Sequence, residues 1–224
     1  MSTEPYPEMS LLPVMGHIEV DNLMTLEAYA KFRQRHHRHL IAERQRRGVN
    51  LGQNMRLQFE SEQTLRYQIQ EMLRIERLFE EADIRAEIEA FAPLMPQGRN
   101  WSATMMLQFA EPEERRLALE RLVGVEACVY LQIPHHDRVY ALSQDERSTE
   151  NAHPSDAQKT SAVHFVTFEF TQKMIQALLS GALVQLGCDH AHYSQACELS
   201  DEILSVLKQD LKQDLKPQVG ESFT

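Results

Sequence analysis

The stretch VEACVYLQIPHHDRVYAL, residues 125–142, is the part of the sequence that indicates the fold class most directly. Apolar residues alternate with other residues through its first half, at Val125, Ala127, Val129, Leu131 and Ile133. This period of two is typical of a strand with one buried face. The residues HHD at 135–137 form a turn, and residues 138–142 follow as a second strand. Two strands joined by so short a turn are expected to pair antiparallel.

Four further strands lie on either side of this hairpin and together favour the α+β class. They are residues 55–59, 103–109, 162–170 and 183–188. The strand from Ala162 to Phe170 is apolar on both faces, so we expect it in the middle of the sheet. The strands follow one another in runs and do not alternate strictly with helices. This pattern predicts a largely antiparallel sheet of about six strands.

Five helical patterns accompany the strands, and we expect four or five of them to form helices. They cover residues 25–47, 61–81, 113–122, 171–180 and 200–215. The first has Thr25 or Asp21 as its N-cap and Gly48 as its stop signal. The second either ends near Glu81 or continues to Phe91, before two prolines end it.

The sequence predicts one α+β domain over residues 21–215. Residues 1–20 are expected to form an extended N-terminal arm, and residues 216–224 a flexible tail. Inside the domain, residues 143–160 contain almost no apolar side chain, which indicates a polar surface loop. A chain of 224 residues is long enough to bury a core and close to the upper size of one domain.

Composition points to a cytoplasmic protein without a membrane span. No apolar stretch approaches the roughly 20 residues that a bilayer-spanning helix needs. The N-terminus carries Glu4 and Glu8, where an exported protein has a basic start and an apolar run. The three cysteines form no CxxC pair, which argues against a disulfide framework and fits a reducing compartment.

Positive charge is concentrated in one helix of an acidic chain. Residues 31–47 hold seven Lys or Arg residues against the single Glu43, whereas the whole chain has a formal net charge of −10. A dipole of this kind predicts an acidic protein partner, such as a redox protein, unless the charges are only a solvated helix face. The acidity of the remaining chain argues against nucleic acid and membrane surfaces as partners.

The long second helix places one carboxylate among apolar residues. Glu76 falls near the middle of the stripe formed by Leu65, Ile69, Met72, Leu73, Ile75 and Phe79. A buried carboxylate must be paired, hydrogen-bonded, protonated or bound to a metal. Glu76 is therefore either a metal, ligand or acid–base residue, or a member of a structural ion pair, unless the stripe is less buried than the pattern indicates.

The first helix shows the same conflict. Arg33 and His37 lie in the middle of its apolar face, so either a polar contact divides that face or both side chains reach toward an anion. Glu76 is the expected partner of Arg33 if the contact is structural.

A group of possible metal ligands follows the last expected strand. Cys188, His190, His192 and Cys197 lie within ten residues, although their spacing matches no standard zinc finger. His164 shares a strand face with apolar residues, where a hydrogen-bonded core histidine is the ordinary alternative to a ligand. An iron or zinc site assembled from separate elements would use Glu76, His164, Asp189 and His190.

Several stretches together resemble an uncharacterised bacterial family of unknown function, about 200 residues long. They are residues 23–29 (LMTLEAY), 67–77 (YQIQEMLRIER), 102–105 (SATM), 162–165 (AVHF) and 187–190 (GCDH) with Tyr193. Members of that family are often encoded near a rubrerythrin-like di-iron protein and an iron–sulfur oxidoreductase. The resemblance therefore implies an accessory of a peroxide-handling or electron-transfer system. The stretches also contain Glu71 and Arg74, which join Arg33 and His37 as candidate ligand-binding residues.

The leading hypothesis is an accessory protein of a redox or peroxide-handling system. It would bind a transition metal or a small anionic ligand and dock an acidic partner through its first helix. The alternatives are a metal-dependent hydrolytic or oxidative enzyme with Glu76 as general base, and an interaction module for protein or nucleic acid that uses helix 31–47. The sequence leaves open whether the chain is an enzyme, and it does not indicate an oligomeric state.

Overall fold

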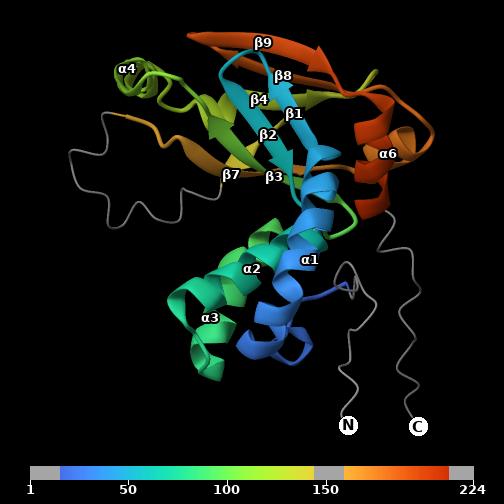
Figure 1. The fold of residues 1–224 in the computed structure, drawn as a ribbon. Coiled ribbons are helices and arrows are strands. Elements are labelled where there is room, and N and C mark those ends of the chain that lie inside the picture. The colour runs from blue at the N-terminus through green and yellow to red at the C-terminus, as the bar shows by residue number, and fades with distance from the viewer. Residues whose placement is uncertain (1–15, 144–158, 212–224) are drawn as a thin grey trace, which may run out of the picture.

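The computed structural model describes residues 16–143 and 159–211, and within them it shows two antiparallel sheets and six α-helices (Figure 1). The α+β class and the antiparallel pairing are confirmed. Residues 1–15 of the expected arm, 144–158 of the expected polar loop and the whole expected tail at 216–224 lie outside the described residues. No helix of the described residues is both long enough and apolar enough to cross a membrane.

The larger sheet has five strands in the order β1-β2-β3-β7-β6. Their bounds are Gly48–Leu51 (β1), Met55–Phe59 (β2), Asn100–Leu107 (β3), Leu142–Ser143 (β6) and Val163–Glu169 (β7). β7 has β3 on one side and β6 on the other, so the prediction of an interior strand at residues 162–170 is confirmed, although the strand in the middle of the order is β3. β6 is only two residues long, and Val163 at the start of β7 is 45% exposed.

The smaller sheet has four strands in the order β5-β4-β8-β9. Their bounds are Val129–Gln132 (β4), Val139–Tyr140 (β5), Gln185–His190 (β8) and Tyr193–Glu198 (β9). The expected hairpin is present as the antiparallel pair β4–β5. Its first strand is shorter than expected, because the left-handed Gly124 (φ +81°) leads into a 3₁₀ turn, η3, at Val125–Cys128. β9 was not predicted from the sequence.

One apolar core joins the two sheets and the helices that pack on them. α4 (Pro112–Arg121), α5 (Gln172–Leu179) and α6 (Asp201–Asp210) all contribute buried side chains to it. Trp101 on β3 is 2% exposed, and its indole N–H donates to the carbonyl oxygen of Leu207 on α6 at 2.9 Å. This hydrogen bond satisfies the polar atom of the largest buried side chain and ties α6 to the sheet.

The remaining helices form a lobe beside the sheets (Figure 1). They are α1 (Leu26–Gln45), α2 (Glu62–Glu76) and α3 (Glu81–Phe91), accompanied by the 3₁₀ turns η1 (Val20–Asn22) and η2 (Ala92–Leu94). The long second helix is thus two helices, because Arg77 adopts a left-handed conformation (φ +57°) and ends α2. A small second core of Met24, Tyr29 and Phe32 lies under the start of α1.

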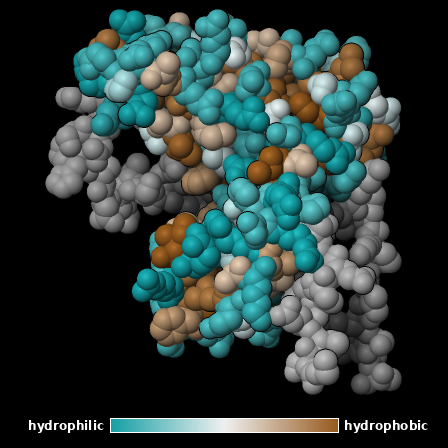
Figure 2. All heavy atoms as spheres, viewed as in Figure 1, coloured by the Kyte–Doolittle hydropathy of each residue, from teal (hydrophilic) through white to brown (hydrophobic). Residues whose placement is uncertain are grey.

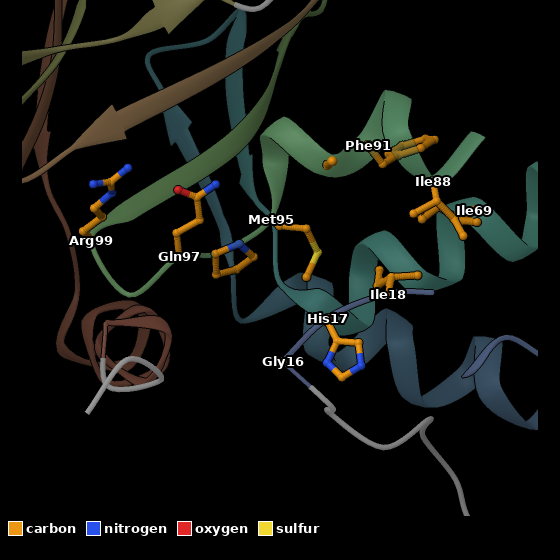
Figure 3. Close-up of a pocket in the computed structure, with 11 residues that line it drawn as sticks. Gly16, His17, Ile18, Ile69, Ile88, Phe91, Met95, Gln97 and Arg99 are labelled. Atoms are coloured by element: carbon orange, nitrogen blue, oxygen red, sulfur yellow. The ribbon is translucent and has the colours of Figure 1, made fainter. Parts of the chain in front are cut away.

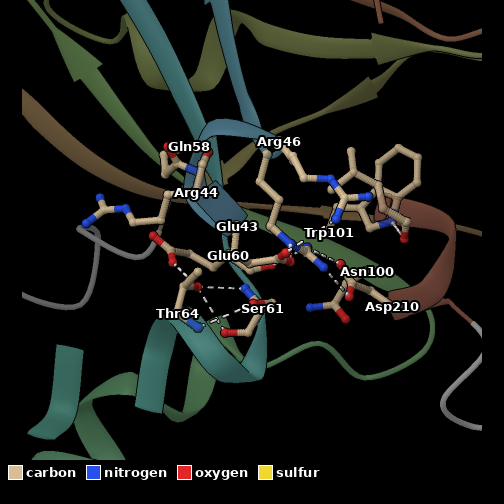
Figure 4. A network of polar contacts seen from close by, with 12 residues as sticks. Glu43, Arg44, Arg46, Gln58, Glu60, Ser61, Thr64, Asn100, Trp101 and Asp210 are labelled. Atoms are coloured by element: carbon tan, nitrogen blue, oxygen red, sulfur yellow. Dashed lines mark hydrogen bonds and ion pairs between the residues drawn. The ribbon is translucent and has the colours of Figure 1, made fainter. Parts of the chain in front are cut away.

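A buried ion pair connects this lobe to the sheets (Figure 4). Arg47, just after α1, donates to both carboxylate oxygens of Asp210 at 2.7 and 3.1 Å, and to Glu43 at 2.8 Å. Arg47 and Asp210 are 3% and 4% exposed. A buried charge without its partner costs several kcal/mol, so this pair fixes the end of α1 against α6.

Candidate functional site

The four expected metal ligands lie on three separate elements. Glu76 is exposed at the last position of α2, His164 is buried on β7, and Asp189 and His190 end β8. The described residues contain no group of three His, Cys, Asp or Glu side chains that could hold a metal ion. The structure therefore does not bring the four expected ligands together.

Glu76 is exposed at the end of α2, where the left-handed Arg77 ends the helix, so Phe79 does not continue its apolar stripe. Ile75 and Phe79, which were expected on the buried stripe, are 60% and 72% exposed. The expectation of a buried Glu76 is thus wrong. Glu76 also does not pair with Arg33. It lies near Glu87, and the pKa of the Glu87 carboxyl is raised first by burial and then by the Glu76 charge.

The other expected metal ligands have ordinary hydrogen-bond partners. The His164 Nε2 lies 3.0 Å from the Thr160 hydroxyl and 2.9 Å from the carbonyl oxygen of Ser161, which fits a core histidine. Asp189 accepts from Arg138 at 2.9 Å and from Tyr140 at 2.8 Å.

The possible zinc ligands also remain apart. The register pairs Cys188 with Gln195 and Cys197 with Leu186, so the two thiols do not face each other across β8 and β9. Burial raises the pKa of Cys188 to about 11 and raises that of Cys197, which disfavours the thiolate form that binds zinc.

In contrast, the four candidate ligand-binding residues come together between α1 and α2. Glu71 accepts from the Arg33 Nε at 2.5 Å, from a terminal Arg33 nitrogen at 3.0 Å and from Arg74 at 2.9 Å. The Tyr29 hydroxyl donates to the same carboxylate at 2.7 Å. His37 lies beside this group, because its Nδ1 is 3.0 Å from the Tyr67 hydroxyl.

Helix periodicity explains why these side chains meet. Arg33 and His37 are one turn apart on α1, and Tyr67, Glu71 and Arg74 are spaced by four and three residues on α2, so each set shares one face. Arg33 pairs with Glu71 instead of Glu76, because five residues along a helix turn a side chain to a different face. We call these five residues, with Tyr29 and Arg44, the α1–α2 cluster.

The electrostatics of the α1–α2 cluster centre on Glu71. Burial alone would raise the pKa of this carboxyl, but hydrogen bonds from Arg33, Tyr29 and Arg74 outweigh burial and lower the pKa to about 2. Burial, followed by the hydrogen bond to Glu71, raises the pKa of Tyr29. Glu71 is therefore charged and the phenol neutral throughout the physiological range.

The α1–α2 cluster carries more positive than negative charge. Burial and the Glu71 charge raise the pKa of the Tyr67 hydroxyl. Three guanidinium groups lie close enough to oppose this rise, those of Arg33, Arg44 and Arg74. Glu71 is the carboxylate that opposes them. The Arg33 and Arg74 side chains remain 41% and 37% exposed, and the buried Nε of Arg74 has no hydrogen-bond partner among the described atoms. The arrangement can therefore receive a further anion.

Sequence reasoning missed Tyr29, Arg44 and Tyr67 as members of the α1–α2 cluster. The signal for Tyr67 was its position one turn before Glu71, and for Arg44 its position two turns beyond His37 on the same face of α1. Tyr29 gave no signal, because a buried tyrosine on an apolar helix face is also an ordinary core residue.

The outward face of α1 extends the positive charge. Lys31, Arg35, Arg38 and Arg46 are all exposed and recur at intervals of three, four and eight residues, so they form one stripe along the helix. We call these four residues the α1 stripe. From Lys31 to the end of the helix the only acidic residue is Glu43, which lies 2.8 Å from Arg47 and 3.9 Å from Arg46. Figure 2 shows the surface over α1 as mainly hydrophilic.

A second buried carboxylate is fully explained by the fold (Figure 4). Glu60 is 2% exposed and precedes the first turn of α2. It accepts from the Thr64 hydroxyl at 2.5 Å, the Thr104 hydroxyl at 2.6 Å and the Gln68 amide at 3.0 Å. Three donors and a helix N-terminus together stabilise this charge, so Glu60 has a structural role.

Comparisons with known proteins assign a family without an activity. A family model described as "Protein of unknown function (DUF3501)" matches residues 17–211. A crystal structure described as a novel protein of unknown function from Burkholderia pseudomallei is 42% identical to this chain, with a TM-score of 0.79. The match covers 87% of this chain and 98% of that one. No curated protein matches the chain.

Proposed function

The chain belongs to the DUF3501 family, and on its geometry we propose that it is an accessory protein that docks an acidic protein partner through the α1 face. The observation that carries the proposal is the α1 stripe, four exposed cations on a stretch of chain whose one carboxylate is Glu43. Oppositely charged surfaces accelerate encounter and select partners, and their attraction weakens as salt increases.

The α1–α2 cluster adds a site for one specific contact beside this stripe. Arg33 presents a planar guanidinium whose orientation is fixed by two hydrogen bonds to Glu71. A guanidinium held in this way can receive a carboxylate of the partner with little loss of side-chain entropy. We assign the long-range attraction to the α1 stripe and the orientation of the partner to Arg33, Arg44 and Arg74.

The proposed setting is a redox or peroxide-handling system, which rests on the family resemblance described above. The docking function itself rests on the charges of α1. Nucleic acid also carries negative charge, but the formal net charge of −10 over the whole chain opposes a long anionic duplex.

The experiment measures the anisotropy of fluorescently labelled poly-L-glutamate as the protein is added. We expect the affinity to fall at least about tenfold when salt is raised from about 50 mM to about 300 mM, because the Debye length shortens. The double variant Arg38→Glu and Arg46→Glu should weaken binding by about tenfold at low salt.

The matched control is the double variant Arg115→Glu and Arg121→Glu. It makes the same change in net charge with two exposed arginines of α4. The proposal requires the α1 variant to lose much more affinity than the α4 variant. Equal losses would mean that only total charge matters, and tighter binding of a single-stranded DNA probe would favour nucleic acid; either result contradicts the proposal.

A further inference from the structure

A cavity of about 520 Å³ lies between residues 16–18, α2, α3 and the loop that leads to β3 (Figure 3). It is on the side of α2 that faces away from α1. Ile18, Ile69, Ile88, Phe91 and Met95 supply an apolar wall. A volume in the range of about 300 to 1,000 Å³ with mainly apolar walls is characteristic of small-molecule sites.

A buried ion pair fixes one wall of this cavity. Arg66 and Glu62 on α2 are each 1% exposed in their side chains and lie 2.7 Å apart. Arg66 also donates to the carbonyl oxygens of His17 and Asn22, and Glu62 accepts from the backbone N–H of Gly16. The chain from residue 16 to residue 22 is thus tied to α2 by charged groups, so the cavity wall does not depend on apolar contact alone.

Two polar side chains of the cavity lie at one end, and His17 lies apart from them beside Ile18. Figure 3 shows Arg99 and Gln97 together at one end, while Ile88, Phe91 and Ile69 lie at the other. Arg99 is exposed, and its guanidinium makes no hydrogen bond or ion pair with a described residue. An apolar pocket that has at one end a guanidinium without a partner among the described residues complements a molecule with an apolar body and an anionic head.

We propose that this cavity binds a small amphipathic anion, an aliphatic carboxylate whose tail lies against Ile88, Phe91 and Met95 and whose head meets Arg99. The apolar walls supply most of the affinity by removing the tail from water. Arg99 supplies selectivity for a carboxylate over a neutral head. This site contains no residue of α1, so its test is independent of the test of the docking function.

The test is isothermal titration calorimetry of the full chain with decanoate below its micelle concentration, and with decanol as the neutral probe. We expect saturable binding of decanoate at one site, with a negative heat-capacity change because apolar surface is buried. Decanol should bind more weakly than decanoate.

Two substitutions and one control locate the site. Arg99→Gln should weaken decanoate about tenfold and leave decanol nearly unchanged, because only the charged hydrogen bond is lost. Ile88→Trp should weaken both probes by filling the apolar end. Arg85→Gln, on α3 but not in this cavity, should change neither. Circular dichroism and thermal unfolding confirm that each variant is folded.

Three outcomes would overturn the proposal. The first is the absence of decanoate binding, or binding that neither Arg99→Gln nor Ile88→Trp alters. The second is binding seen only after Leu11→Asp and Leu12→Asp, because the chain's own N-terminal segment would then be the occupant. The third is that free decanoate does not bind but the protein sediments with phosphatidylglycerol vesicles, and that Arg99→Gln abolishes this sedimentation. The surface would then bind a lipid bilayer and not a free carboxylate.

Discussion

Replacing Glu71 with glutamine removes the charge that organises the α1–α2 cluster. Two nitrogens of Arg33, one of Arg74 and the Tyr29 hydroxyl donate to this carboxylate, whose side chain is 13% exposed. Lowering its pKa from 4.5 to about 2 corresponds to at most about 3 kcal/mol of stability. Because Arg33 and Arg74 are more than a third exposed, solvent screening reduces the expected loss in Glu71→Gln to about 2 kcal/mol.

The loss should depend on pH in a defined direction. The folded-state pKa is depressed, so the Glu71 contribution is complete above the unfolded value of 4.5 and disappears as pH falls toward 2. The difference in unfolding free energy between wild type and Glu71→Gln should therefore be constant near neutral pH and fall by about half near pH 3.

Urea unfolding followed by circular dichroism, at several pH values, measures this difference. Asp83→Asn is the control, because Asp83 is an exposed carboxylate on α3 outside the α1–α2 cluster. The same substitution frees Arg33 and Arg74, so Glu71→Gln should bind poly-L-glutamate more tightly although it is less stable. A loss below about 0.5 kcal/mol near pH 7, or a loss that does not change with pH, would refute this account of the cluster.

Three further substitutions or reactions test the fold that positions the site. Arg47→Met leaves the Asp210 carboxylate buried without its partner and should cost about 3 to 5 kcal/mol in urea unfolding, whereas adding Asp210→Leu should recover most of that loss. Full stability of the single variant would contradict the buried pair. Gly187→Ala would place its Cβ 2.3 Å from the Tyr130 ring, so thermal unfolding should show a loss of about 1 to 3 kcal/mol that Tyr130→Ala relieves. Iodoacetamide near pH 8 should label Cys188 last of the three cysteines and mainly after unfolding, because it is 1% exposed and burial raises its pKa to about 11; early labelling of Cys188 would show that the core at β8 opens readily.

Local patterns predicted much of the fold, and tertiary pairing explains most of what they missed. The cap at Thr25 and the alternation at residues 55–59 appear in the structure as the start of α1 and as β2. The break after Glu76 has no such signal, since Arg77 takes a left-handed conformation that glycine or asparagine usually adopts. β9 was missed because most of its side chains face solvent and it lacks the apolar alternation of a half-buried strand.

The candidate site, like the fold, was predicted only in part from local patterns. Arg33 and His37 were identified because polar side chains on an apolar helix face require a partner, and the structure supplies Glu71 and Tyr67. The metal set failed because it combined residues from a helix and two strands whose relative positions depend on sheet order. No local pattern contains that order, which puts β7 and β8 in different sheets.

The most direct test of the docking function is to locate the bound acidic probe by NMR. A titration of isotopically labelled protein with poly-L-glutamate should shift the amide signals of residues 31–46 and the facing turns of α2, and raising the salt should reverse these shifts. Shifts concentrated on α4 or spread evenly over both sheets would show that α1 is not the docking surface.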